Sequence, residues 1–210
     1  MPYSKFTFDQ VRENLELEIS DKFGVFTDVG EIEISDSFCE ELLNEKVPLA
    51  LAINTEKARS ELIITPVLYE LRKYEKKNIS LFSGIDFNID ESKGLNGICD
   101  YIISLSREQF FLDVPIVTIV EAKNEKINSG LPQCMAEMKA AQIFNQNKGN
   151  KNIKEMFGVV TTGSNWKFLV LENNKVTIEL KEYFIQDVKK ILGIFHRMFE
   201  SSRCPMSFRS

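Results

Sequence analysis

The sequence predicts an α/β protein: a mixed β-sheet core flanked by helices, with an α/β appendage at the N-terminus. Two observations lead to this fold class. Apolar runs of strand length alternate with longer stretches whose apolar residues recur at helical spacing. The chain also has 210 residues, 43% of them hydrophobic, which is enough for one globular domain with a full core. We expect the appendage at residues 1–50, the core at 51–201 and a flexible tail at 202–210.

The predicted helices follow from apolar spacing and capping residues. In the appendage, one face of a short amphipathic helix is marked by Phe8, Val11, Leu15 and Ile19. A few short strands and a helical turn at 38–43 should follow it. In the core, helices are predicted over 55–76, 131–145 and 186–201. Thr55 is the expected N-cap of the first, and Pro66 is a candidate kink within it.

The predicted strands are apolar runs bounded by turn residues. They span 79–89, 97–104, 115–123, 156–162, 166–171 and 176–184. An antiparallel pairing of the second and third of these would bring Asp100 beside Glu121, because the start of one strand faces the end of the next.

The third strand carries the main functional signal. It is a β-branched run from Ile116 to Val120 that ends in Glu121, Ala122 and Lys123. Alternation along a strand puts Glu121 and Lys123 on one face and Ala122 on the other. Acid-x-lysine patterns occur elsewhere in the chain, but only Glu121 follows five apolar or β-branched residues. Charged groups leaving a hydrophobic strand are costly to bury without partners, so other residues should meet them.

Three further positions, on both sides of Glu121-Ala-Lys123, complete a recognisable order. Glu61 lies on the upstream helix, Asp100 in the Gly97-Ile-Cys-Asp sequence, Glu121-Ala-Lys123 on the next strand, and Gln133 on the following helix. This order resembles the PD-(D/E)XK nuclease superfamily, which has the restriction-endonuclease-like fold, and looks most like its RecB-type branch. The resemblance covers roughly residues 55–185. The sequence departs from it at Cys99, where the name-giving proline would stand, and at Glu137, where the RecB-type motif has a tyrosine.

The resemblance implies a Mg²⁺- or Mn²⁺-dependent nuclease that hydrolyses phosphodiester bonds in nucleic acid, with DNA as the expected substrate. It implies that Asp100, Glu121 and the carbonyl of Ala122 hold the metal, with Glu61 as a further ligand, either directly or through water. Lys123 would orient the attacking water, and Gln133 would bind the phosphate backbone or position Lys123. The chemistry agrees, because carboxylate and carbonyl oxygens form a hard site suited to these cations.

Other readings of the same residues stay open. Glu61 could instead pair with Arg59, Lys57 or solvent, and Asp100, Glu121 and Lys123 could form a structural ion network. A nuclease-fold protein without catalysis would bind nucleic acid or another protein. The chain could also act as a homodimer or need a partner subunit. A group of lysines in polar segments could line a phosphate-binding rim: Lys139, Lys148, Lys151, Lys154 and Lys167.

Composition excludes several other classes. The formal net charge of -5 provides no overall basic field for nucleic acid, although a local basic groove is compatible with it. The four cysteines are scattered without a CxxC pair, which argues against a zinc site or a disulfide framework. No apolar run is long enough to span a membrane, and the first residues lack the apolar region of a signal peptide, so we expect a cytoplasmic protein. His196, the single histidine, is expected to be a packing or surface residue.

Overall fold

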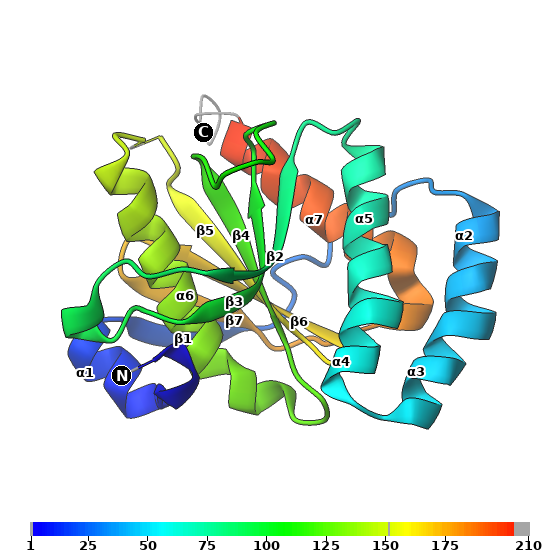
Figure 1. Ribbon diagram of the computed structural model, residues 1–210, viewed down its shortest axis with the longest axis horizontal. Helices are drawn as coiled ribbons and strands as arrows, with labels where there is room; N and C mark the ends of the chain where they lie inside the picture. Colours follow the sequence, from blue (N-terminus) through cyan, green and yellow to red (C-terminus); the bar gives the residue numbers. More distant parts are fainter. Residues whose placement is uncertain (1, 151, 204–210) are drawn as a thin grey trace.

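A computed structural model describes residues 2–150 and 152–203 and has the predicted α/β architecture (Figure 1). A mixed sheet of eight strands is flanked by helices, and its strand order is β1-β7-β6-β5-β4-β3-β2, with β8 paired to β6. The strands are β1 (Glu18–Lys22), β2 (Ser80–Asp86), β3 (Ile98–Ser104), β4 (Ile116–Ala122), β5 (Glu155–Thr161), β6 (Asn165–Glu172), β7 (Lys175–Glu179) and β8 (Tyr183–Phe184). The α-helices are α1 (Phe8–Leu15), α2 (Asp36–Glu41), α3 (Val47–Ile53), α4 (Glu56–Arg59), α5 (Thr65–Tyr74), α6 (Ile127–Asn147) and α7 (Val188–Arg203).

The strand pairing sets the frame for the candidate site. β2, β3 and β4 are antiparallel neighbours, and β5 lies parallel to β4 after the chain crosses over through α6. β6 and β7 continue the sheet in antiparallel order. The predicted antiparallel pairing of the segments at 97–105 and 115–123 is therefore confirmed.

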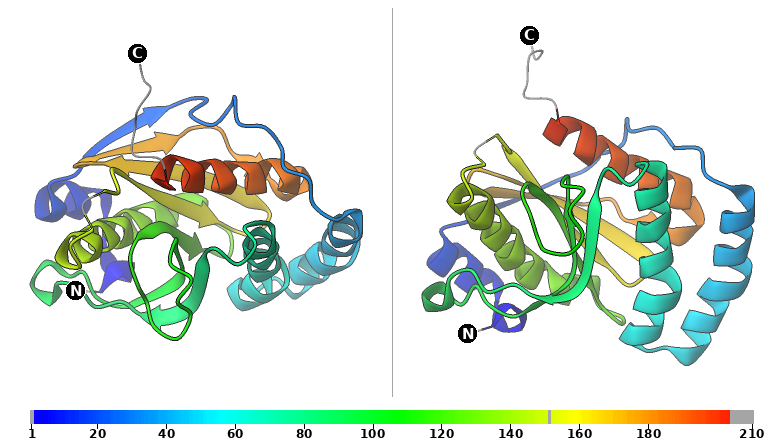
Figure 2. Two further views of the ribbon diagram at one scale, coloured as in Figure 1. Left: turned by 90° about the horizontal axis from the view of Figure 1, so that it is seen from above. Right: turned by 45° about the horizontal axis from the view of Figure 1, so that its top comes forward.

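Two apolar clusters fill the two faces of the sheet. One joins α6 and α1 to the sheet, and the other joins α5 and α7 to it. In β4, Ile119 packs in the α6 cluster, whereas Val120 and Ala122 pack in the α5–α7 cluster. Since side chains alternate along a strand, Glu121 lies on the α6 face. Figure 2 shows α2 and α3 running beside α4 and α5 at one end of the molecule.

The N-terminal segment contributes to both the sheet and the core. β1 pairs in parallel with β7, and Tyr3 and Val11 are buried in the α6 cluster. The Tyr3 hydroxyl donates a 2.7 Å hydrogen bond to the Phe87 carbonyl. The helix predicted over 8–19 ends at Leu15, because Glu16 adopts a left-handed conformation (φ 54°), and Ile19 lies in β1 instead.

Two prolines change the helical hydrogen bonding before them. The helix predicted over 55–76 begins at the expected N-cap, where the Thr55 hydroxyl accepts a hydrogen bond from the Ala58 amide at 3.1 Å. It then passes through a π-helical segment at Ser60–Ile64 before Pro66, and a second π-helical segment at Leu42–Lys46 precedes Pro48. A proline lacks the N–H for an i to i−4 bond, and its ring clashes with the carbonyl at i−4. Just before Pro66, the Thr65 amide donates to the carbonyl of Ser60, five residues back instead of the four of an α-helix.

The predicted start of the helix at residue 131 is wrong by one turn. α6 begins at Ile127, and Pro132 lies inside the helix. The polar residues at 124–130 suggested a loop, but Gly130 has a packing reason to be in the helix. A Cβ there would lie 2.7 Å from Val160 and 3.1 Å from the Lys123 side chain, so only glycine lets α6 approach β4 and β5 this closely.

α7 is the last element of the described part of the chain. Ser202 and Arg203, the first residues of the predicted tail at 202–210, belong to this helix, and residues 204–210 lie outside the described part of the chain. His196 lies on α7 and hydrogen-bonds through Nδ1 with the buried Glu75 carboxylate at 2.6 Å. Within residues 2–150 and 152–203, no helix combines the length and apolar character needed to cross a membrane.

Candidate active site

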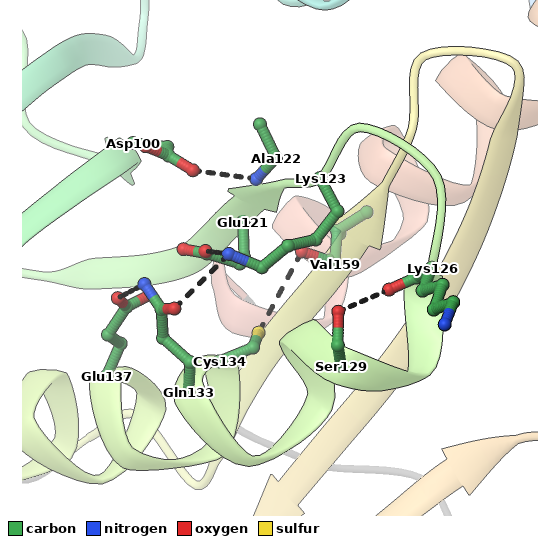
Figure 3. A network of polar contacts seen from close by, with 10 residues as sticks. All are labelled: Asp100, Glu121, Ala122, Lys123, Lys126, Ser129, Gln133, Cys134, Glu137 and Val159. Atoms are coloured by element: carbon green, nitrogen blue, oxygen red, sulfur yellow. Dashed lines mark hydrogen bonds and ion pairs between the residues drawn. The ribbon is translucent and has the colours of Figure 1, made fainter. Parts of the chain in front are cut away.

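Asp100 and Glu121 meet where β3 and β4 separate. The regular pairing of these strands runs to Tyr101 and Val120, although β4 continues to Ala122. Beyond that point the Asp100 carboxylate takes the place of a backbone acceptor on β3: its Oδ2 accepts a 2.8 Å hydrogen bond from the Ala122 amide (Figure 3). The N–H and C=O of one residue point to the same edge of a strand, so the Ala122 carbonyl also faces Asp100. The structure thus brings Asp100, Glu121 and this carbonyl together, as the sequence suggested.

Lys123 and Gln133 belong to the same cluster, on the side of Glu121 that faces α6. Lys123 Nζ donates a short, charged hydrogen bond to Glu121 Oε1 and a 3.3 Å bond to Gln133 Oε1. The Glu121 side chain is 1% exposed and that of Lys123 is 20% exposed. The predicted shared face of Glu121 and Lys123 is therefore confirmed, and Figure 3 shows Gln133 reaching them from α6.

Glu137 is a member of this cluster that sequence reasoning did not select. It is fully buried on α6, and its Oε1 accepts a 3.0 Å hydrogen bond from Gln133 Nε2. This bond fixes the Gln133 amide, so the Gln133 oxygen faces Lys123. The sequence contained one signal for it: Gln133 and Glu137 are one helical turn apart, and Glu137 lies between the buried Met135 and Met138.

The cluster contains more acidic than basic side chains. Asp100, Glu121 and Glu137 supply three carboxylates, while Lys123 is the one ammonium bonded to them among the described residues. Burial, followed by the Asp100 charge, raises the pKa of Glu121 to about 8. Burial and the Glu121 charge also raise the pKa of Glu137 well above its usual value. Burial alone would lower the pKa of Lys123, but its contact with Glu121 outweighs burial and raises the pKa.

Two buried oxygens of the cluster have no hydrogen-bond partner. Among the described residues, nothing donates to Glu121 Oε2 or to Glu137 Oε2. A buried polar atom without a partner costs free energy, and a buried charge costs more. The cluster therefore has unused buried oxygens on acidic groups. A divalent cation would favour the ionised form of these acids and use their oxygens as ligands.

Glu61, the helical glutamate expected at the site, is not brought into the cluster. Its side chain is 63% exposed, and it forms an ion pair with Lys57 at 3.7 Å, one of the alternatives that the sequence left open. The reason is local. Glu61 lies in the π-helical segment at Ser60–Ile64, where the wider turn departs from the 3.6-residue period of an α-helix and so changes the direction of the side chains.

A different helical glutamate acts on the cluster. The charge of Glu56, the first residue of α4, contributes to raising the pKa of both Glu121 and Lys123. In the sequence this residue resembles an ordinary first-turn acid that favours the helix N-terminus. Its proximity to β4 depends on how α4 packs, which no local pattern reveals.

The predicted lysine rim is not a single surface. Lys167 is buried on β6 and pairs with Glu182 at 3.6 Å, whereas Lys139 bonds to Gln142 and Asn174. Lys148 follows the C-terminus of α6 and Lys154 precedes β5, so both lie at the end of the sheet opposite the acidic cluster. Lys151 lies outside the described residues.

Comparison of the chain with known protein-family models, with curated proteins and with solved structures found no match. In the described part of the chain, no group of three or more His, Cys, Asp or Glu side chains is arranged so that it could hold a metal ion. The chemistry of Asp100, Glu121 and Lys123 therefore carries the functional interpretation on its own.

The Glu121 pKa makes a testable prediction about stability without divalent cations. The folded protein holds the Glu121 proton up to a pH of about 8, whereas the unfolded chain releases it near 4.5. Between these values the folded state binds more protons, so the free energy of unfolding should fall as the pH rises. Chemical denaturation in chelator across this range measures the effect, and Glu121→Gln should flatten it. Equal pH profiles for the variant and the wild type would contradict the assignment.

Proposed function

We propose that this chain is a divalent-cation-dependent nuclease that hydrolyses phosphodiester bonds in nucleic acid, with DNA as the first substrate to test. The observation that carries the proposal is the meeting of the Asp100 and Glu121 carboxylates with the Lys123 ammonium at the point where β3 and β4 separate. The order of elements supports it. A helix, three antiparallel strands, a crossover helix and a parallel strand follow one another, as a PD-(D/E)XK-like, restriction-endonuclease-like core requires.

The residues present fit Mg²⁺ or Mn²⁺. Asp100, Glu121 and the Ala122 carbonyl offer hard oxygen ligands, and Glu121 Oε2 has no partner among the described residues. Mg²⁺ is usually bound through one or two carboxylates together with substrate phosphate oxygens, so two carboxylates and a carbonyl are a sufficient protein contribution. Such an ion would supply Lewis acidity at the phosphoryl group and a more acidic bound water.

Lys123 has the position and the free donor needed to act on the attacking water. An ammonium has three N–H donors, and two of those on Lys123 are used by Glu121 and Gln133. The third can orient water or stabilise charge that develops on a phosphoryl oxygen. Gln133 acts through Lys123: with its amide fixed by Glu137, it holds the ammonium above Glu121 and is a positioning residue.

The direct test is cleavage of plasmid and single-stranded DNA, with an RNA strand as a further substrate, in Mg²⁺ or Mn²⁺. Cleavage should require the divalent cation, disappear in chelator and disappear in Lys123→Ala. Circular dichroism of the variant shows whether the fold is retained. Cleavage that persists in chelator, or that Lys123→Ala performs at the wild-type rate, would overturn the proposal.

The second candidate is a nuclease-fold protein that binds nucleic acid or another protein without cleaving. Two observations favour it: Glu61 faces solvent, and the cluster is acidic, which repels phosphate when no cation is present. The same assay separates the two functions. Absence of cleavage on every substrate, with retained folding and measurable binding, would identify the binding module.

Glu56 and Glu61 form a matched pair of variants for the helical carboxylate. We expect Glu56→Gln to raise the Mg²⁺ concentration needed for half-maximal cleavage roughly three- to five-fold, because the Glu56 charge acts on Glu121 and Lys123. Glu61→Gln should leave cleavage unchanged, since Glu61 pairs with Lys57 in solvent. Mg²⁺ titrations of the cleavage rate measure both. A larger effect of Glu61→Gln than of Glu56→Gln would support Glu61 as the helical carboxylate of the site, as the resemblance implied.

A further inference from the structure

Glu137 has no role in the cation position described above, yet its burial demands an explanation. It is the one acid of the cluster that comes from a helix rather than a strand, and it is fully excluded from solvent. Its Oε1 accepts from Gln133, but its Oε2 has no partner among the described residues. A carboxylate that only held the Gln133 amide could be a glutamine, which would accept the same bond without the charge.

Glu121, on the sheet face that packs against α6, also has one buried oxygen without a partner among the described residues. Its Oε1 is bonded to Lys123, and its Oε2 is the second buried oxygen without a described partner. The Glu121 charge raises the pKa of Glu137, so the two groups lie close enough to interact. Figure 3 shows both carboxyl groups between β4 and α6, and each has one buried oxygen without a partner among the described residues.

We propose that Glu121 and Glu137 hold a second divalent cation between β4 and α6, with Glu121 shared between this position and that of Asp100. The proposal rests on the proposed function in one respect, because it takes the Asp100 side of Glu121 as the first cation position. A bound cation would satisfy both free oxygens and balance the charge of the two glutamates in their ionised form, which Lys123 alone does not balance.

The surroundings favour a hard cation such as Mg²⁺ or Mn²⁺ over Zn²⁺. Two thiols, those of Cys99 and Cys134, lie near the glutamates, and both are buried. Burial and the nearby carboxylates raise the pKa of each thiol, which keeps the sulfurs protonated. Thiols are poor ligands in that form, so the available ligands are oxygens.

Calorimetric titration with Mn²⁺ alone, without nucleic acid, tests the proposal. The wild type should bind two ions, and Glu137→Gln should lose one of them or bind it at least about ten-fold more weakly. Glutamine keeps the acceptor for Gln133, so the variant removes the charge and retains the bond. Asp100→Asn should lose the other ion. Glu179→Gln is the matched control. Glu179 is buried, but both of its oxygens accept hydrogen bonds from backbone amides, those of Gly24, Phe26 and Lys181. The Glu179→Gln protein should therefore still bind two ions.

A second measurement compares the wild type with Glu137→Gln by spectroscopy. Two Mn²⁺ ions sharing the Glu121 carboxylate should give a spin-coupled electron paramagnetic resonance spectrum, and the spectrum of Glu137→Gln should be that of an isolated ion. Unchanged stoichiometry and affinity in Glu137→Gln, with an uncoupled wild-type spectrum, would overturn the second position. If Asp100→Asn still abolishes DNA cleavage in that case, the proposed function stands. If neither variant changes Mn²⁺ binding and cleavage is absent, both proposals fall.

Discussion

Asp100→Asn should lower the rate of DNA cleavage about 1,000-fold, roughly 4 kcal/mol of transition-state stabilisation. The substitution keeps an oxygen that can accept the Ala122 amide bond, so the separation of β3 and β4 should persist. What it removes is one of the two negative charges next to the Ala122 carbonyl, and with it the charge that draws a divalent cation to this edge of the sheet. Single-turnover cleavage of labelled DNA at saturating Mg²⁺ measures the loss.

The control for this variant is stability. Removing the Asp100 charge relieves repulsion on Glu121, so the cation-free variant should be at least as stable as the wild type. A loss of cleavage accompanied by unfolding would point to a structural role for Asp100. Full cleavage by a folded Asp100→Asn protein would remove Asp100 from the reaction.

Lys123→Met should destabilise the cation-free protein by about 3–5 kcal/mol at a pH above 8, in addition to abolishing cleavage. Methionine replaces most of the lysine stem, so packing against Gly130 is largely kept. The loss comes from Glu121, which is 1% exposed and would lose the one ammonium bonded to it among the described residues. Because Lys123 lowers the Glu121 pKa, the variant must either bury an unpaired carboxylate or take up a proton from solvent at this pH. Urea denaturation in chelator measures the effect.

A double variant separates the charge effect from packing. With Glu121→Gln already present there is no Glu121 charge to leave unpaired, so Lys123→Met should cost much less in this background. Equal costs of Lys123→Met in both backgrounds would show that the side chain stabilises the protein through packing alone.

The strand that carries Glu121 and Lys123 could be predicted because its determinants are local. Five β-branched or apolar residues identify a buried strand, and alternation then fixes which face each of the next residues takes. The position of Asp100 followed from a single further assumption, that neighbouring segments pair in antiparallel order.

The helical acids could not be placed in the same way. Glu61 was assigned to the site from the order of elements in the resemblance, and its direction was left open. The π-helical segment before Pro66 changes the direction of the side chains there, which a sequence pattern does not reveal. Glu137 belongs to the cluster through the packing of α6 on β4, and the charge of Glu56 acts on the cluster from α4. That packing depends on contacts distant in sequence, including the close approach at Gly130, which reads as a loop residue in isolation.

The most direct test of the central claim is a crystal of the protein soaked in Mn²⁺, measured for anomalous scattering. We predict a peak bounded by Asp100, Glu121 and the Ala122 carbonyl, with the Lys123 ammonium beside it. A soaked crystal with ordered carboxylates and no anomalous peak at Asp100 and Glu121 would contradict the account.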